Sequence, residues 1–292
     1  MRYTNSLDSS KETTLFDILK WKLFYSTKSQ KEMSKLEVVD SSNLLRAKSD
    51  FICWLSHASF LIQLDGKRFL IDPVFGDIPL YKRYNPSPYD VEDLGKIDYL
   101  LLSHTHYDHF DIPSLKKILP QKPKLIIPLG MDRYIKRLDK NADMVLLDWY
   151  QSFKIDSLII DFVPAKHWGR RGIFDTNQSL WGGFIIQGKQ SIYFAGDTAY
   201  AEHFQEIGDR YSIDYALLPI GAYRPTFFMK HHHLNPEEAY QAFLELKAKK
   251  MIPMHYGTFK LSDESINEPK QWIEKMNREQ IEILSSGEVL LF

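Results

Sequence analysis

Short apolar segments separated by polar turns begin near residue 51 and predict a series of strands. The first three strands are predicted over residues 51–55, 59–64 and 68–71, where side chains are apolar or alternate with polar ones. Asp65-Gly66 separates the last two segments and is a typical hairpin turn. The apolar run at residues 99–102 predicts a further, buried strand. We therefore expect four strands between residues 51 and 102.

After residue 110 the pattern alternates between helical and strand segments. Helices are predicted over residues 113–119, 131–138, 236–249 and 269–278. Strands are predicted over residues 124–128, 144–147, 158–163, 181–186, 191–194, 215–218, 250–254, 281–284 and 289–291. No repeat or linker interrupts the sequence after residue 45. We expect an α+β fold in which residues 46–292 form one domain whose sheets are covered by helices.

Residues 1–45 are interpreted as an N-terminal extension. Residues 13–25 are rich in large apolar side chains and are followed by Lys28, Lys31 and Lys35, so a helix here would have the pattern of an interfacial membrane anchor. Docking of this helix on the main domain or on a second subunit is the alternative that we favour. The extension thus leaves two expectations to test, a homodimer contact and a peripheral membrane contact.

Composition narrows the class of protein. The 37 Lys and Arg residues are balanced by 38 Asp and Glu residues, and this charge gives no field that would attract nucleic acid. Residues 1–12 lack the apolar core of a secretory signal, and no apolar run approaches the ~20 residues of a membrane span, so a cytoplasmic location is expected. The single cysteine, Cys53, excludes an intrachain disulfide and a cysteine-rich zinc site, and its apolar neighbours predict a buried thiol.

The segment that follows the buried strand at residues 99–102 predicts a metal site. It contains five potential ligands: His104, His106, Asp108, His109 and Asp111. So many imidazoles and carboxylates are hard to bury together without a cation. In an extended segment the first three would point to one side, whereas a curled loop could give His104 and His106 to one metal and Asp108 and His109 to a second. A solvated, histidine-rich loop is the weaker alternative.

Three more potential ligands follow predicted strands. They are His167 after residues 158–163, Asp197 after residues 191–194 and His255 after residues 250–254. Together with the first segment they complete a two-metal arrangement. The first metal takes His104, His106 and His167, the second takes Asp108, His109 and His255, and Asp197 bridges them. These nitrogen and oxygen ligands suit two zinc ions best, with iron or manganese as alternatives.

Two features near these ligands are also interpreted as parts of the site. Asp72, directly before Pro73, is either an acceptor for a ligand histidine or a cap of the turn. The long loop at residues 74–89 is expected to line or cover a site.

The run His104-Thr-His106-Tyr-Asp108-His109 resembles the His-x-His-x-Asp-His signature of the metallo-β-lactamase superfamily. Further motifs in the same order resemble the N-acyl phosphatidylethanolamine-hydrolysing phospholipases D and their bacterial relatives. They include Trp54-Leu-Ser-His57-Ala, Leu70-Ile-Asp72-Pro73, Phe194-Ala-Gly-Asp197-Thr, Pro219-Ile-Gly-Ala-Tyr223 and His255-Tyr-Gly-Thr-Phe259. The similarity extends from about residue 51 to residue 288, outside the N-terminal extension.

This resemblance implies a four-layer αββα sandwich with a dinuclear zinc site and the same seven ligands. It implies catalytic roles for Asp108 and Asp197 and for His233, which matches a histidine near the site of the family and is expected to contact substrate or transfer a proton. Arg171, Tyr223 and His57 are expected to contact substrate.

The predicted function is that of a dinuclear-zinc phosphodiesterase of the phospholipase D type, acting on N-acyl phosphatidylethanolamine-like phospholipids. The alternative is a lactonase or small-ester hydrolase, similar to the phosphorylated ascorbate lactonase that shares the histidine motif. A di-iron oxidoreductase would carry a carboxylate in place of His106 and a flavin domain, and neither is found. The balanced charge argues against a nuclease, and the complete ligand set argues against a scaffold protein.

Overall fold

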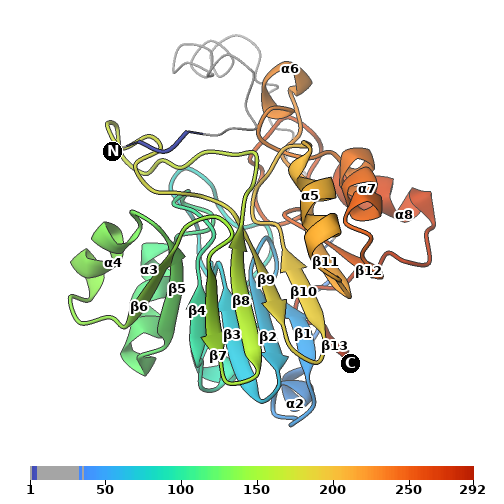
Figure 1. Cartoon of the computed structure of the whole chain (residues 1–292). Coiled ribbons are helices and arrows are strands. Elements are labelled where there is room, and N and C mark those ends of the chain that lie inside the picture. Colours follow the sequence, from blue (N-terminus) through green and yellow to red (C-terminus); the bar gives the residue numbers. More distant parts are fainter. Residues whose placement is uncertain (1, 5–32, 35) are drawn as a thin grey trace.

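Two β-sheets form the centre of the computed structural model, which describes residues 2–4, 33–34 and 36–292 (Figure 1). The first sheet contains β1 (Phe51–Trp54), β2 (Phe60–Leu64), β3 (Lys67–Ile71), β4 (Tyr99–Leu101), β5 (Lys124–Pro128), β6 (Met144–Leu147) and β13 (Val289–Leu291), in the order β13-β1-β2-β3-β4-β5-β6. The second contains β7 (Ser152–Ile155), β8 (Leu158–Val163), β9 (Gly183–Gln187), β10 (Ser191–Phe194), β11 (Tyr215–Pro219) and β12 (Lys250–Met254), in the order β12-β11-β10-β9-β8-β7.

Helices cover the outer faces of both sheets. The described helices are α2 (Ser42–Leu45), α3 (Ile112–Ile118), α4 (Asp132–Leu138), α5 (His203–Arg210), α6 (Thr226–Met229), α7 (Pro236–Glu245) and α8 (Glu268–Met276), with 3-10 turns η1 (Val91–Leu94) and η2 (Leu119–Gln121). α3 and α4 lie beside the first sheet, and α5, α7 and α8 lie beside the second (Figure 1). This arrangement confirms the predicted four-layer αββα sandwich.

Alternation of side chains along the strands builds two cores. Ile52 and Trp54 of β1 point toward the second sheet, and contacts such as that between Phe60 of β2 and Phe194 of β10 join the sheets, with ring centroids 6.2 Å apart. Phe51 and Cys53 point the other way, into the apolar layer beneath α3 and α4. The predicted burial of Cys53 is confirmed, and burial raises the pKa of its thiol.

Strand direction brings the loops with candidate ligands to one edge. β3, β4, β5 and β6 run parallel in the first sheet, and β10, β11 and β12 run parallel in the second. β8 and β10 are both antiparallel to β9, so they share one direction. The carboxyl ends of strands that run in one direction share one edge of their sheet, which is where α/β folds place binding residues.

Most predicted elements are confirmed within a few residues, and the differences have local causes. The predicted strand at residues 281–284 is wrong, because Ile281 forms only an isolated bridge with Met251. The predicted helix at residues 236–249 ends at Glu245, since Lys247 adopts a left-handed conformation with φ of 54°. Several elements were not predicted, namely β7, α2, α5, α6 and the two 3-10 turns. β7 is a four-residue edge strand, α2 and α6 have four residues each, and α5 has no side-chain cap and contains Gly208.

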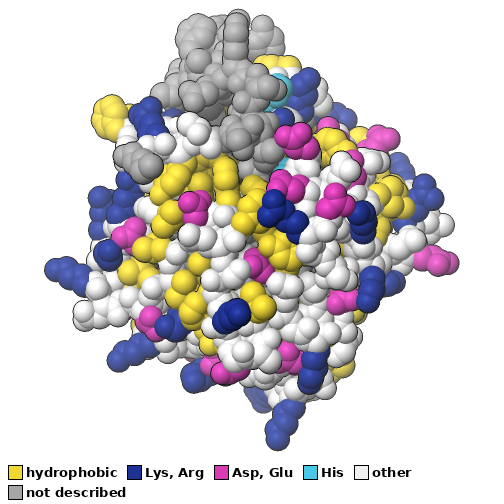
Figure 2. All heavy atoms as spheres, in the orientation of Figure 1, with side chains coloured by type: hydrophobic (Ala, Val, Ile, Leu, Met, Phe, Trp, Pro, Cys, Tyr) yellow, Lys and Arg dark blue, Asp and Glu magenta, His cyan; other side chains and the backbone are white. Residues whose placement is uncertain are grey.

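The described part of the N-terminal extension packs on the rest of the chain. Leu36 and Leu45 are buried, and Ser34 Oγ donates to the carbonyl oxygen of Gly257 at 2.7 Å. The predicted helix at residues 13–25 lies outside the described residues. Among the helices that the structure describes, none is long and apolar enough to cross a lipid bilayer. On the face shown in Figure 2, basic and acidic side chains of the described residues are interspersed.

Candidate metal centre

The structure brings all seven predicted ligands together beyond the carboxyl ends of the strands. The turn after β4 curls, because the amides of His109 and Phe110 both donate to the carbonyl oxygen of His106, at 3.2 and 2.8 Å. This curl turns His109 back toward its neighbours, as the two-metal interpretation requires. His167, Asp197 and His255 follow β8, β10 and β12, respectively.

The first ligand group consists of His104, His106 and His167. His106 Nδ1 lies 2.9 Å from His104 Nε2 and 3.1 Å from His167 Nε2. Asp197 Oδ2 lies 3.9 Å from His104 Nε2 and 3.8 Å from His167 Nε2. The four ligand atoms all lie within 4.8 Å of one another, so one cation can contact all of them.

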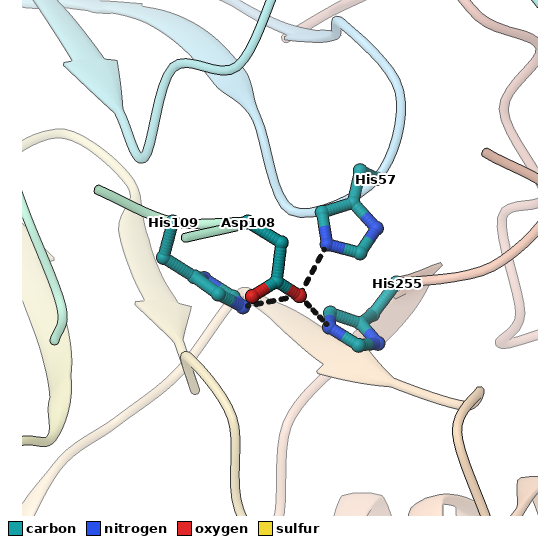
Figure 3. A group of neighbouring side chains, drawn as sticks. All are labelled: His57, Asp108, His109 and His255. Carbon is teal, nitrogen blue, oxygen red and sulfur yellow. Dashed lines mark hydrogen bonds and ion pairs between the residues drawn. The ribbon is translucent and has the colours of Figure 1, made fainter. Parts of the chain in front are cut away.

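The second ligand group consists of Asp108, His109 and His255, and His57 lies with them, since one potential ligand atom of each of the four residues lies within 4.8 Å of the others (Figure 3). Asp108 Oδ2 lies 3.3 Å from His255 Nε2 and 3.6 Å from His109 Nε2. Asp197 reaches this group as well, with Oδ2 at 3.2 Å from His109 Nε2 and Oδ1 at 3.2 Å from His255 Nε2. The Asp197 carboxylate therefore lies between the two groups, in the position predicted for a bridging ligand.

Several buried atoms of these residues fit a metal ion better than any protein partner. Three of these buried atoms form no hydrogen bond with another described residue: His109 Nε2, His255 Nε2 and Asp197 Oδ1. They take part in ion pairs instead, since His109 Nε2 lies 3.2 Å from Asp197 Oδ2 and His255 Nε2 lies 3.2 Å from Asp197 Oδ1. Buried polar atoms without hydrogen bonds are costly, and a cation placed among them removes that cost. Nitrogen and carboxylate donors suit zinc, and iron or manganese also accept them.

One carboxylate orients a histidine in each group. Asp72 Oδ2 accepts a hydrogen bond from His109 Nδ1 at 2.8 Å and another from the Ser103 hydroxyl. Because that hydroxyl donates to Asp72, it accepts from His104 Nδ1, which lies 2.9 Å away. Both histidines thus carry their proton on Nδ1 and direct Nε2 toward the candidate metal positions. Of the two interpretations of Asp72, the geometry supports the acceptor for a ligand histidine.

The other orienting contacts come from loops. His167 Nδ1 lies 3.0 Å from the carbonyl oxygen of His232, which leaves its Nε2 for the first group. Left-handed backbone conformations at Ser56, His57 and Asp72 shape the surrounding turns, with φ of 81°, 52° and 41°. Strained conformations at residues other than glycine persist where the surrounding structure enforces them, often at functional sites.

The first group contains neutral nitrogen donors. Burial lowers the pKa of His106 to about 4, and burial together with the neighbouring imidazoles holds the pKa of His104 and His167 well below the ordinary value. Neutral imidazole is the form that binds a metal ion.

In the second group, the two histidines have raised pKa values and the carboxyl group has a lowered one. Burial would lower the pKa of His109 and His255, but the Asp197 and Asp108 carboxylates outweigh it, raising the pKa of His255 to about 9 and that of His109 well above the ordinary value. Burial would likewise raise the pKa of both carboxyls, but the charge of His109 and its neighbours holds it well below the usual range. Protons here occupy the side chains that a metal ion would bind.

The structure places the predicted substrate-contacting residues unevenly. His233 is half-buried, with Nδ1 at 3.8 Å from Asp197 Oδ2. Arg171 Nη1 donates to the carbonyl oxygens of Phe110 and Thr105, at 2.5 and 3.3 Å, and Tyr223 is buried with its hydroxyl donating to Glu268 at 2.8 Å. His57 is buried beside Asp108, with Nε2 at 3.0 Å from Oδ2. Substrate contact by these residues stays a prediction.

Sequence reasoning missed Ser103 and Arg83. Ser103 directly precedes the histidine motif, and a hydroxyl next to a candidate ligand could have indicated a supporting role. Arg83 lies in the loop at residues 74–89 and donates to the Ser56 hydroxyl at 2.5 Å and to the Val74 carbonyl at 2.7 Å. The loop therefore lies against the turn that carries His57, beside the second ligand group.

Known proteins that this chain resembles include metal-dependent hydrolases. A family model described as a beta-lactamase superfamily domain matches residues 67–256. The chain is 35% identical over 246 residues to N-acyl-phosphatidylethanolamine-hydrolyzing phospholipase D 1 of Caenorhabditis elegans, which covers 77% of this chain and 69% of that protein. It is 34% identical over 239 residues to the mitochondrial protein of that name from Saccharomyces cerevisiae, covering 76% and 51%. The chain thus spans about half to two thirds of these relatives.

Other relatives match along nearly their whole length. A metal-dependent hydrolase of Pyrobaculum aerophilum is 30% identical over 242 residues, which is 82% of this chain and 98% of that one. Among solved structures, the metallo hydrolase Igni18 of Ignicoccus hospitalis superposes with a TM-score of 0.65 at 26% identity, covering 84% of this chain and 98% of that one.

Proposed function

The chain belongs to the beta-lactamase superfamily and is a metal-dependent hydrolase, and we propose that it cleaves phosphodiesters with two zinc ions in a reaction of the phospholipase D type. The proposed substrates are N-acyl phosphatidylethanolamine-like phospholipids. The observation that carries the proposal is the Asp197 carboxylate, which lies 3.2 Å from a nitrogen of both His109 and His255 and within 4 Å of His104 and His167. The similarity to the worm and yeast phospholipases supports the choice of substrate.

The side chains divide the work in a way that suits phosphodiester hydrolysis. When bound, a pair of divalent ions lowers the pKa of water at the site and neutralises negative charge on the substrate. Asp197 holds the two ligand groups at one carboxylate, and Asp108 orients the attacking oxygen from the second group. His233 approaches Asp197 to 3.8 Å and its side chain is 13% exposed, so it can pass a proton between the leaving group and solvent.

A lipid substrate requires apolar surface near these groups. The centroid of the Trp168 ring lies 4.5 Å from that of the His106 ring and 6.0 Å from that of the His232 ring. Phe227 of α6 is 62% exposed and precedes the loop that carries His233. We propose that Trp168 and Phe227 contact acyl chains and that this side of the molecule approaches the membrane surface. Tyr223 and Met229, which are buried, are unsuited to this role.

The test uses the full chain loaded with zinc. Bis(p-nitrophenyl) phosphate reports phosphodiester cleavage, vesicles that contain N-acyl phosphatidylethanolamine test the lipid, and a simple lactone tests the alternative activity. We expect cleavage of both phosphodiesters and slow or absent lactone opening. Lactone opening without phosphodiester cleavage, at two bound ions per chain, would refute the proposal and favour the lactonase. Cleavage of the chromogenic diester alone would retain the phosphodiesterase and refute the lipid substrate.

A further inference from the structure

We infer that His57 is a positioning residue of the second ligand group: its imidazole fixes Asp108 and its backbone fixes His255. His57 lies in the turn between β1 and β2, far from the histidine motif in the sequence. The inference rests on the proposed metal centre, since it concerns how two ligands of that centre are held. It assigns His57 to the support of the ligands rather than to substrate contact.

The side chain of His57 approaches Asp108 more closely than the ligand histidines around it do. Its Nε2 atom forms a hydrogen bond with Asp108 Oδ2 at 3.0 Å, and both residues are buried. His109 Nε2 and His255 Nε2 form longer ion pairs with the same oxygen, at 3.6 and 3.3 Å (Figure 3). A nitrogen that is hydrogen-bonded to a ligand carboxylate supports that ligand, whereas the nitrogens at longer distances are available to a metal ion.

The backbone of His57 connects the same turn to the loop after β12. The His255 amide donates to the His57 carbonyl oxygen at 2.8 Å, and the His57 amide donates to Thr258 Oγ1 at 3.0 Å. The Trp54 indole donates to that carbonyl as well, at 2.9 Å. One residue therefore holds Asp108 through its side chain and His255 through its main chain.

The conformation of the turn serves both contacts. Ser56 and His57 are consecutive residues with positive φ, and neither is glycine. The imidazole of His57 packs on the His255 ring with centroids 4.1 Å apart and meets the edge of Phe259 at 5.1 Å. These contacts hold the imidazole against Asp108, so the carboxylate loses its freedom to rotate.

Two substitutions separate a hydrogen bond from mere volume. His57→Phe keeps the ring and removes the donor, whereas His57→Gln keeps a donor that reaches Asp108. The metal-free chain of each variant is titrated with Co²⁺, and visible absorption and competition with a chelator give the affinity for each ion. We expect H57F to bind the second Co²⁺ about 10–100-fold more weakly, with the first ion unaffected, and H57Q to restore the wild-type affinity and spectrum.

The control is the same exchange at another fully buried histidine. His203 contacts the Thr198 hydroxyl at 3.2 Å and belongs to neither ligand group, so H203F reports the general cost of burying phenylalanine in place of histidine. H203F is expected to retain both Co²⁺ affinities. If H57F does not fold, H57N replaces it, because asparagine accepts a positive φ and is too short to reach Asp108.

The first three of the remaining outcomes reject the inference, and the fourth concerns the substrate alone. Wild-type affinity of H57F for both ions would show that the hydrogen bond is dispensable. Equal losses in H57F and H57Q would make His57 a metal ligand or a packing residue. A wild-type chain that binds no second ion would refute the proposed metal centre, and with it this role, whereas a wild-type chain that binds two ions without cleaving phosphodiesters would refute only the substrate.

Discussion

The two ligand groups share Asp197 but are held in different ways. In the first group, His104 is oriented by the Ser103 hydroxyl and His167 by a backbone carbonyl. In the second group, His109 is oriented directly by the Asp72 carboxylate at 2.8 Å. Hydrogen bonds to charged groups are shorter and stronger than those between neutral groups. His109 of the second group is therefore oriented by a buried charged side chain, whereas the orientation of the first group depends partly on a loop.

Replacing Asp197 tests what the groups have in common and should have the largest effect. Asp197→Asn removes the negative charge that both groups share, so we expect loss of both ions and an activity loss greater than the ~100-fold caused by supporting residues. Elemental analysis and diester turnover measure this. Asp161→Asn is the matched control, since Asp161 is also buried and its carboxylate accepts from Ser152 and Gln187, outside both ligand groups. A fully active D197N variant would disprove the bridging role.

Replacing His233 tests whether this residue is an additional ligand of either group. Its nitrogen lies near Asp197 and His255, in an arrangement that could also hold a metal. We expect His233→Ala to retain both ions and to lose turnover, because the residue is proposed to move a proton. His231→Ala, two residues away, should keep both ions and activity. Loss of an ion from H233A would make His233 a ligand, and wild-type turnover would remove it from the mechanism.

Asp72 tests the support that reaches both groups. Asp72→Asn weakens the acceptor for His109 and, through Ser103, the support of His104. We expect both ions to bind about 10–100-fold more weakly, with the greater loss at the second. Chelator competition measures the two affinities separately. A loss confined to the first ion would reverse the proposed order of direct and indirect support.

Ser103→Ala should give the smallest effect, confined to the first group. The substitution leaves His104 Nδ1 without its acceptor but keeps the direct bond between Asp72 and His109. We expect roughly 10-fold weaker binding of the first ion, the lower end of the range for supporting hydrogen bonds, and an unchanged second ion. Chelator competition again gives both values, and equal losses at both ions would show that the two groups are not separable.

The convergence of the candidate ligands could be predicted from the sequence better than the contacts that support them, for a physical reason. His167, Asp197 and His255 each follow a strand, and strands that share a direction must end at one edge, so their convergence could be predicted. The hydrogen bond between His57 and Asp108 depends instead on positive φ at Ser56 and His57, which the pattern of residues does not predict.

Arg171 illustrates a second limit of sequence reasoning. Substrate contact by Arg171 stays a prediction, and its Nη1 atom donates to the backbone carbonyls of Thr105, within the histidine motif, and of Phe110, directly after it. Which partner a long side chain selects depends on tertiary packing, and the residue type alone does not specify it.

The carbonyl oxygen of His232 has a consequence for thermodynamic coupling. This atom orients His167, and the next residue along the loop is His233, which faces Asp197. A molecule that binds and stabilises this loop would also stabilise His167, the proposed ligand of the first ion, and an ion bound by His167 would stabilise the loop in return. Such coupling is reciprocal, so each would raise the equilibrium affinity for the other by the same factor.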